Sequence, residues 1–137
     1  MKLFKRKLSD KQRAALARLA DGIECGAKLR PQVHNKLFDW VSNEDFGSCA
    51  IGAALECAKI EQEGEFDPNR YVGLGSNDYG DVLAMYGVTT TAQMKTVVIE
   101  DKEITDKDAG VDDLIYRLND WLLWSRERIA QFLREVE

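Results

Sequence analysis

Three cysteines and one histidine carry the most reactive side chains of this sequence, and they stand far apart along the chain. Cys25, Cys49 and Cys57 include no C-x2-C pair, and together with His34 they reproduce no familiar zinc spacing. Cys49 and Cys57 are eight positions apart in one predicted helix, which separates their Cα atoms by about 12 Å and excludes a disulfide between them. We therefore interpret both as small hydrophobic core residues and expect no metal site.

Cys49 also permits a catalytic interpretation, because it stands in the first turn of a predicted helix. The partial positive charge at that end lowers the pKa of a thiol and makes it a better nucleophile. The only histidine, His34, lies in a polar stretch that suggests no triad, and it is interpreted as a surface residue. A small enzyme or ligand-binding domain around Cys49, Asn119 and Asp120 is kept as an alternative, and it requires these side chains to share one pocket.

Two further patterns resemble ligand loops and fail on their spacing. The acidic run 106–112 departs from a calcium loop because Gly110 is one position early and Arg117 replaces the required glutamate. Gly73 and Gly75 lack both the third glycine of a dinucleotide fingerprint and the Gly-Lys-Ser/Thr of a P-loop. The sequence therefore predicts neither a metal nor a cofactor.

The elements that would carry these residues are mainly helical. Ser9 to Gln12 forms a capping box that begins a helix over about 10–25, and Gly26 should end it in a left-handed cap. The small residues of 49–60 predict a central helix, capped by Ser48. Its Gly52 should mark a close contact with a neighbouring backbone, because glycine in a helix otherwise costs stability.

The rest of the chain is predicted from apolar spacing and caps. Residues 32–41 suggest a short helix or turn in which Phe38 and Trp40 close one end of the core. Four further helices are expected over 82–85 after a cap at Asn77 or Asp78, over 91–99, over 111–120, and after a cap at Ser125. The β-branched run in 91–99 leaves a strand as the alternative.

Composition places these elements in one domain. The chain has 137 residues, of which 45% are apolar and 31% charged, an ordinary globular balance. The net charge is -5, yet residues 1–30 carry nine Lys or Arg against three acids. We predict a mainly α, single-domain bundle over 1–137, with five to six helices around the small-residue helix and a basic lead-in at 1–8. No secretory or membrane-spanning stretch is seen, so we expect a cytoplasmic protein.

Three stretches carry a resemblance, and they are Leu16–Gly26 (LARLADGIECG), Ser48–Ala54 (SCAIGAA), and Leu118-Asn119-Asp120 with Arg126–Leu133 (RERIAQFL). The chain resembles a broad set of small, uncharacterised bacterial and bacteriophage proteins with a central C-A-[LI]-G-A helix. The resemblance implies a helical domain of phage type and no reaction. It implies that Asn119 and Asp120 satisfy free backbone groups at a turn between helices. The segment between Thr91 and Asn119 is longer here than in that set.

The leading hypothesis is a non-enzymatic, phage- or mobile-element-type protein that binds another protein. Inhibition of a host defence protein, as anti-CRISPR proteins do, is one version, and host cytoplasm would then be its location. Trp121, Trp124 and Tyr79 are the expected exposed anchors, since interfaces favour Trp and Tyr. Asn119, Asp120 and Cys49 are further candidate binding residues. The sequence does not predict an oligomeric state.

A third hypothesis is nucleic-acid binding through the basic N-terminus, with an affinity that falls steeply as salt is added. The contributing side chains would be Lys2, Lys5, Arg6, Lys7, Lys11 and Arg13. The acidic remainder of the chain weighs against it. That acidic surface could instead imitate a phosphate track, although charge of this kind also serves solubility.

Overall fold

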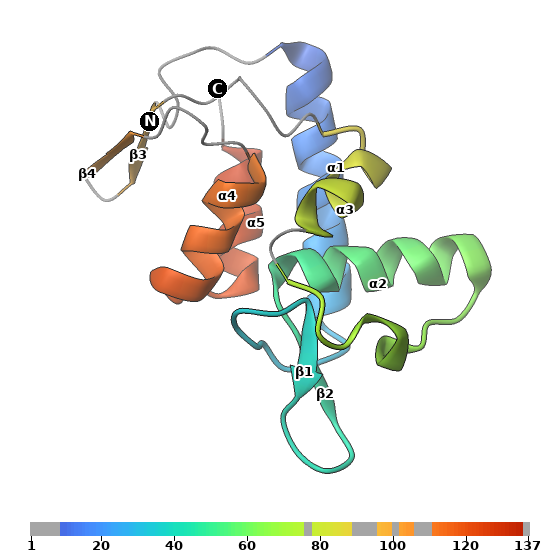
Figure 1. The fold of residues 1–137 in the computed structure, drawn as a ribbon. Helices are drawn as coiled ribbons and strands as arrows, with labels where there is room; N and C mark the ends of the chain where they lie inside the picture. The colour runs from blue at the N-terminus through green and yellow to red at the C-terminus, as the bar shows by residue number, and fades with distance from the viewer. Residues whose placement is uncertain (1–8, 76–77, 89–95, 100–101, 106–110, 136–137) are drawn as a thin grey trace.

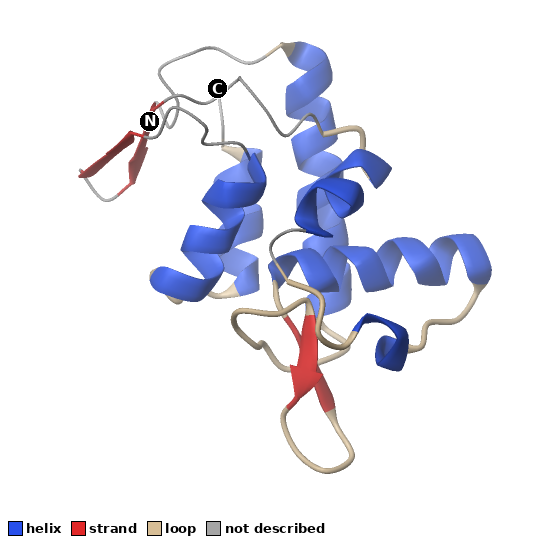
Figure 2. Cartoon of the chain, in the orientation of Figure 1, coloured by secondary structure: helices blue, strands red, loops and turns tan. Residues whose placement is uncertain are grey.

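The computed structural model describes residues 9–75, 78–88, 96–99, 102–105 and 111–135 (Figure 1). Within them, five α-helices pack together with a small two-stranded hairpin (Figure 2), which confirms the mainly helical prediction. The elements in order are α1 (Asp10–Ala27), β1 (Phe38–Trp40), β2 (Phe46–Ser48), α2 (Ala50–Glu63), the 3-10 turn η1 (Pro68–Tyr71), α3 (Tyr79–Met85), β3 (Thr96–Ile99), β4 (Lys102–Thr105), α4 (Val111–Tyr116), the π-helical turn η3 (Arg117–Trp121) and α5 (Arg126–Arg134).

α1 begins at the predicted cap, where Ser9 Oγ accepts a hydrogen bond from the Gln12 amide at 3.2 Å. It continues through Gly26 to Ala27 and is capped by Lys28 with ordinary right-handed angles, so the predicted glycine cap is wrong. Glycine at position 26 is instead required by the packing of α1 against α2. A Cβ there would overlap the backbone carbonyl of Ala53, so glycine lets α2 cross directly against α1.

α2 is the small-residue helix predicted from the sequence, and all nine residues from Ala50 to Ala58 are buried. Its cap is Cys49, whose Sγ accepts from the Gly52 amide at 3.3 Å, whereas the predicted cap Ser48 ends β2. Gly52 meets a neighbouring backbone as predicted, because a Cβ there would overlap the carbonyl of Leu37. α2 is therefore packed through its backbone on two sides.

α5 packs mainly on α1, so α1 contacts both of the other long helices (Figure 1). The predicted cap is confirmed, since Ser125 Oγ accepts from the Arg128 amide at 3.1 Å. At the other end of α5, Arg134 pairs with Asp21 at 2.7 Å and with Glu24 of α1. Ion pairs and the buried apolar face of α5 together hold it against α1.

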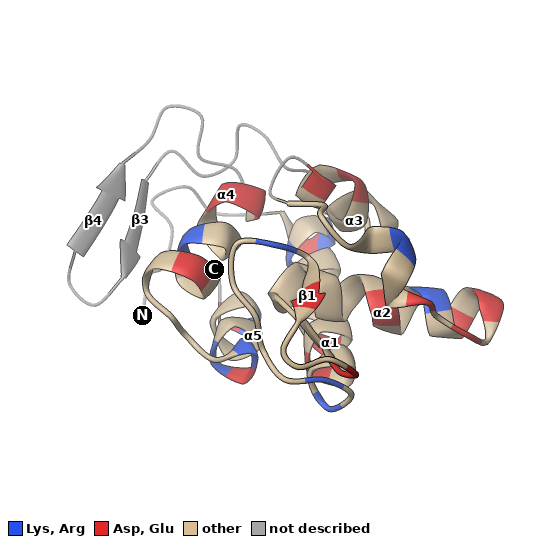
Figure 3. Ribbon diagram, turned by 60° about the horizontal axis from the view of Figure 1, so that its bottom comes forward, with Lys and Arg blue, Asp and Glu red and all other residues tan. Residues whose placement is uncertain are grey.

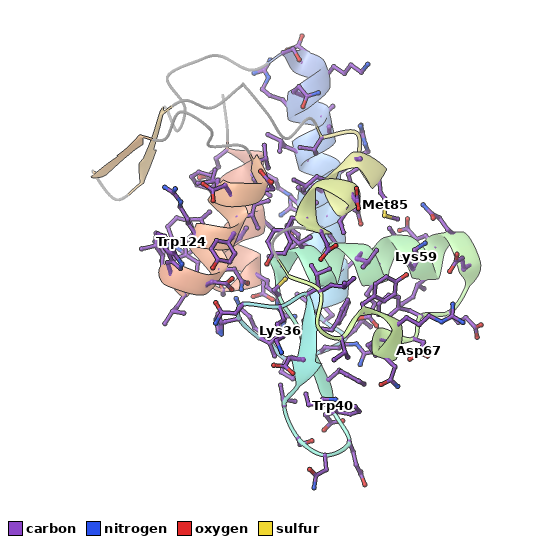
Figure 4. The ribbon with its side chains drawn as sticks, in the orientation of Figure 1. Lys36, Trp40, Lys59, Asp67, Met85 and Trp124 are labelled. Carbon is purple, nitrogen blue, oxygen red and sulfur yellow. The ribbon has the colours of Figure 1, made fainter. Side chains whose placement is uncertain are left out.

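Residues 32–41 do not form the predicted helix or turn. Phe38 pairs with Ser48 and Trp40 with Phe46 in the antiparallel β1–β2 hairpin. Phe38, at the base, is fully buried as expected. Trp40 does not close the core, because the hairpin projects from the helices (Figure 4) and its ring stacks on Phe46 at 3.7 Å between centroids.

The remaining predictions are met in part. Asp78 precedes α3, but its carboxylate accepts from the Gly75 amide rather than capping the helix, and Asn77 lies outside the described residues. The strand alternative for 91–99 is confirmed over Thr96–Ile99, which pairs with β4, whereas 91–95 are not described. The helix predicted at 111–120 is α4, followed by the π-helical turn η3. None of the described helices is both long and apolar enough to cross a membrane.

Adding a methyl group at either helix contact should destabilise the protein. Gly26→Ala and Gly52→Ala would each press a Cβ onto a backbone carbonyl that cannot rotate away. We expect each to lower the free energy of unfolding by about 2 kcal/mol, even though alanine is the better helix former. Urea unfolding followed by circular dichroism measures this change.

Gly75→Ala is the matched control. The nearest atom to its added Cβ would be the Asn35 carbonyl oxygen at 3.6 Å, an ordinary van der Waals contact. Its effect should stay within about 0.5 kcal/mol. Equal stability of all three variants would contradict the close-crossing explanation.

Candidate functional site

Asn119 lies at the centre of a buried polar cluster and joins three segments of the chain. Its Oδ1 accepts from Gln32 Nε2 at 2.8 Å and from the Ala50 amide at 3.1 Å. Its Nδ2 donates to the Val33 carbonyl at 3.1 Å and to Asp120 Oδ1 at 2.6 Å. All four hydrogen-bonding positions of the amide are therefore used. One of them satisfies a backbone N–H at the start of α2 that has no partner within its own helix.

Arg126 is a second buried member of the cluster, and its guanidinium binds oxygen atoms of the backbone. Nη1 donates to Ser48 Oγ at 2.9 Å and to the Ser48 carbonyl at 3.3 Å. Nη2 donates to the carbonyls of Ala27 at 3.3 Å and Arg30 at 2.6 Å, just beyond the end of α1. The carbonyl end of a helix carries partial negative charge, which favours a cation there. Burial lowers the pKa of Arg126 from its ordinary value.

Cys49 and Tyr79 form a sealed pair beside this cluster. The Cys49 Sγ lies 3.4 Å from the Tyr79 hydroxyl, and neither residue has any exposed surface. Burial raises the pKa of both groups, and the nearby Asp120 carboxylate raises them further. The thiol is therefore neutral at physiological pH. The preferred interpretation of Cys49 as a core residue is confirmed by its burial. The alternative of a thiol activated by the helix end is not supported, because desolvation of the thiolate outweighs the hydrogen bonds that favour it.

The structure brings Cys49, Asn119 and Asp120 together, as the enzyme alternative required, but Cys49 and Asn119 lie in the interior and Asp120 is half-buried. Asn119 holds the residue after Cys49, and Asp120 acts electrostatically on its thiol. Cys49 and Asn119 are buried, and neither lines a cleft described below. The arrangement can therefore fix the junction of β2 and α2.

The three predicted aromatic anchors differ in exposure. Trp121 is 65% exposed, whereas Trp124 is 7% exposed and Tyr79 is fully buried, so the expected exposure is wrong for the last two. The Trp124 ring meets Phe132 edge-on at 5.8 Å and lies under the Arg128 guanidinium at 3.8 Å. Figure 4 shows it beside the C-terminal helices. Its neighbour Trp121 is left outside.

The exposed segment 121–123 is the largest run of uncovered apolar side chains in the described residues. Leu122 is 45% and Leu123 66% exposed. Leu123 has φ +55°, in the left-handed region that a leucine rarely adopts. The turn is fixed on both sides, because the Leu122 amide donates to Arg117 at 2.9 Å and the Trp124 amide donates to Leu118 at 2.9 Å.

Two open clefts lie elsewhere. A cleft of 490 Å³ between α1, α2 and α3 is lined in part by Arg18, Cys25, Cys57, Glu61, Met85 and Tyr86. A shallower one of 310 Å³ lies around η1 and the end of α2, with Glu63, Glu65 and Asp67 beside Arg70. Among the described residues, no group of three or more His, Cys, Asp or Glu is arranged to hold a metal ion. His34 is exposed, as predicted, and the acidic residues 106–110 lie outside the described part.

Sequence reasoning missed Gln32, Ser48 and Arg126 as members of the cluster. The position of Arg126 in the sequence could have indicated this role, because it is the first residue of α5 and the positive end of the helix dipole disfavours a cation there. Such a residue must gain its stabilisation from another element. Gln32 and Ser48 gave no such indication, since their partners lie between 78 and 92 positions away.

Comparisons with known proteins add no assignment. No family model, no curated protein and no solved structure matches this chain. The resemblance to small bacterial and bacteriophage proteins stays a prediction.

Removing the Asn119 amide should be costly. Asn119→Ala leaves the Ala50 N–H and the Val33 carbonyl without their partner in a buried place, which should lower the free energy of unfolding by roughly 2–4 kcal/mol. Chemical denaturation checks the value. Asn43→Ala, at an exposed position of the hairpin loop, is the control and should be nearly neutral. A neutral Asn119→Ala would show that the cluster does not hold the fold together.

The thiols should differ in reactivity under native conditions. Because Cys49 is sealed and protonated, alkylation by iodoacetamide at pH 8 should modify exposed Cys25 first and Cys49 only after urea is added. Peptide mapping after timed quenching measures each rate. Native labelling of Cys49 as fast as that of Cys25 would restore the enzyme alternative.

Proposed function

We propose that this chain is a non-enzymatic protein-binding domain that docks through the segment 121–123. The observation that carries the proposal is the run of three exposed apolar side chains Trp121, Leu122 and Leu123 on a turn fixed by backbone hydrogen bonds. Burying a large apolar side chain contributes about 1.5–3 kcal/mol, so a soluble domain gains nothing by leaving three together in water. A partner that covers them would gain that energy.

The orientation of the Trp121 ring is fixed by neighbouring side chains. Arg117 lies over it at 5.5 Å from the ring centroid, and Tyr116 meets it edge-on at 6.1 Å. Arg117 is itself paired with Asp113 at 3.1 Å. A tryptophan whose orientation is fixed in the free protein loses less entropy on binding, which favours an interface hot spot. The geometry suits a folded partner with an apolar pocket for an indole ring.

The interior chemistry supports a binding role over catalysis. Asn119 binds two backbone groups and the side chains of Gln32 and Asp120, and the two Nη atoms of Arg126 donate to backbone carbonyls and to the Ser48 hydroxyl. The Cys49 thiol is neutral and closed off. The cluster instead supports the turn from both ends, because Gln32 donates to the Trp124 carbonyl at 2.8 Å while it also binds Asn119. The buried polar cluster therefore helps to hold the exposed segment 121–123 in its conformation.

A phage or mobile-element origin, and inhibition of a host defence protein, rest on the resemblance alone. Basic and acidic residues occur together on each of α1, α2 and α5 (Figure 3), so none of these three helices carries charge of one sign alone. Nucleic-acid binding has no comparable support, since residues 1–8 are not described and Arg13 pairs with Asp10. We therefore favour a protein partner recognised through apolar contact.

The test replaces the exposed anchors. Trp121→Ser with Leu123→Ser should weaken partner binding by about 2 kcal/mol or more, roughly 30-fold in Kd, while the thermal midpoint stays within a few degrees. Crosslinking in lysates of a source or host cell, followed by affinity capture and quantitative mass spectrometry, identifies partners lost from the variant. The binding constant is then measured with the purified partner.

Trp40→Ser with Val41→Ser is the matched control, because it removes another exposed aromatic–aliphatic pair, from the hairpin. The control should retain the partner. Equal loss in both variants, or no partner with either protein, would contradict docking through 121–123. Sedimentation of the wild type tests whether a second copy of the chain is the occupant.

A further inference from the structure

A pair of thiols lies in the 490 Å³ cleft, away from the proposed docking segment. Cys25, on α1, is exposed, and Cys57, on α2, is buried at the cleft wall. Both side chains line this one cleft, and the neighbouring Cys25 thiol is among the causes that raise the pKa of Cys57. Neither the packing of the helices nor the proposed binding function uses this juxtaposition.

The helix crossing explains why the thiols meet. Gly26 lies against the backbone of Ala53, which brings the axes of α1 and α2 unusually close at that point (Figure 1). Cys25 directly precedes Gly26, and Cys57 stands one helical turn beyond Ala53. Both cysteines therefore flank the point at which the backbones of α1 and α2 come into contact.

The surroundings give the two sulfur atoms different roles. Cys25 is open to solvent in the cleft, which Arg18 of α1 and Met85 of α3 also line. Cys57 donates to Glu61 Oε1 at 3.8 Å. Burial first, then Cys25 and Glu61, hold the pKa of Cys57 above its usual value, so it remains protonated. An incoming reagent therefore meets Cys25 before Cys57.

We propose that Cys25 and Cys57 form a reversible disulfide that links α1 to α2, with a low-molecular-weight disulfide such as glutathione disulfide as the oxidant. The Cys25 thiolate attacks one sulfur of the oxidant and forms a mixed disulfide, while one glutathione thiolate leaves and takes up a proton. The Cys57 sulfur then attacks the Cys25 sulfur, passes its proton through Glu61 to solvent, and expels the second glutathione. Two protein thiols are oxidised, and one glutathione disulfide is reduced to two thiols.

The test incubates the full chain with glutathione disulfide and follows intact mass over time. The wild type should end without an adduct and with only one thiol left of three. Digestion with trypsin and a glutamate-specific protease separates Cys49 from Cys57 by cutting after Glu56, and should yield segment 25–28 linked to segment 57–59. This map requires no variant and so does not depend on how any substitution folds.

Two variants isolate the steps. Cys57→Ser should stop at a glutathione adduct on Cys25, because the resolving sulfur is absent, whereas Cys25→Ser should form neither product. A stable adduct on wild-type Cys25, a link that includes Cys49, or no reaction of Cys25 would each overturn the proposal. None of these results depends on docking through 121–123.

Discussion

The end of β2 and the start of α2 meet inside the protein, where water cannot satisfy their peptide groups, and the half-buried end of α1 lies beside them. Asn119 and Arg126 supply the missing partners, and both come from the C-terminal part of the chain. An unpaired buried peptide group costs about as much as a lost hydrogen bond, and several meet here at once. The N-terminal half therefore depends on partners from the last two elements, which makes this junction the constraint on which the domain depends.

The sequence motifs acquire a physical meaning at this junction. The stretch SCAIGAA provides Ser48 and the amide of Ala50, and the last two motifs provide Asn119 and Arg126. The predicted structural role of Asn119 is right in kind but wrong in place, since it satisfies backbone groups of distant segments rather than of its own turn. Residues of these motifs are far apart in the sequence, but in the structure they form one hydrogen-bonded cluster.

Local rules predicted α1, α2 and α5, because caps such as Ser9 and Ser125 and apolar spacing act within a few residues. These local rules do not predict contacts between residues that are far apart in the sequence. Gly26 matches a C-terminal cap equally well until Ala53 is known to lie against it. The alternative of an activated Cys49 stayed open for the same reason, since no neighbour in sequence reveals that its thiol is shielded from water.

Trp121 and Trp124 show most directly why the candidate site could not be read from the sequence. They are the same residue type three positions apart, yet one is exposed and the other is covered by Phe132 and Arg128. The left-handed residue Leu123 reverses the chain between them, so the helical rule that residues three apart share a face no longer applies. Gln32 binds both Asn119 and the Trp124 carbonyl and so fixes the turn that follows Trp121. The exposure of Trp121 therefore depends on hydrogen bonds of the same buried cluster that holds the helices together.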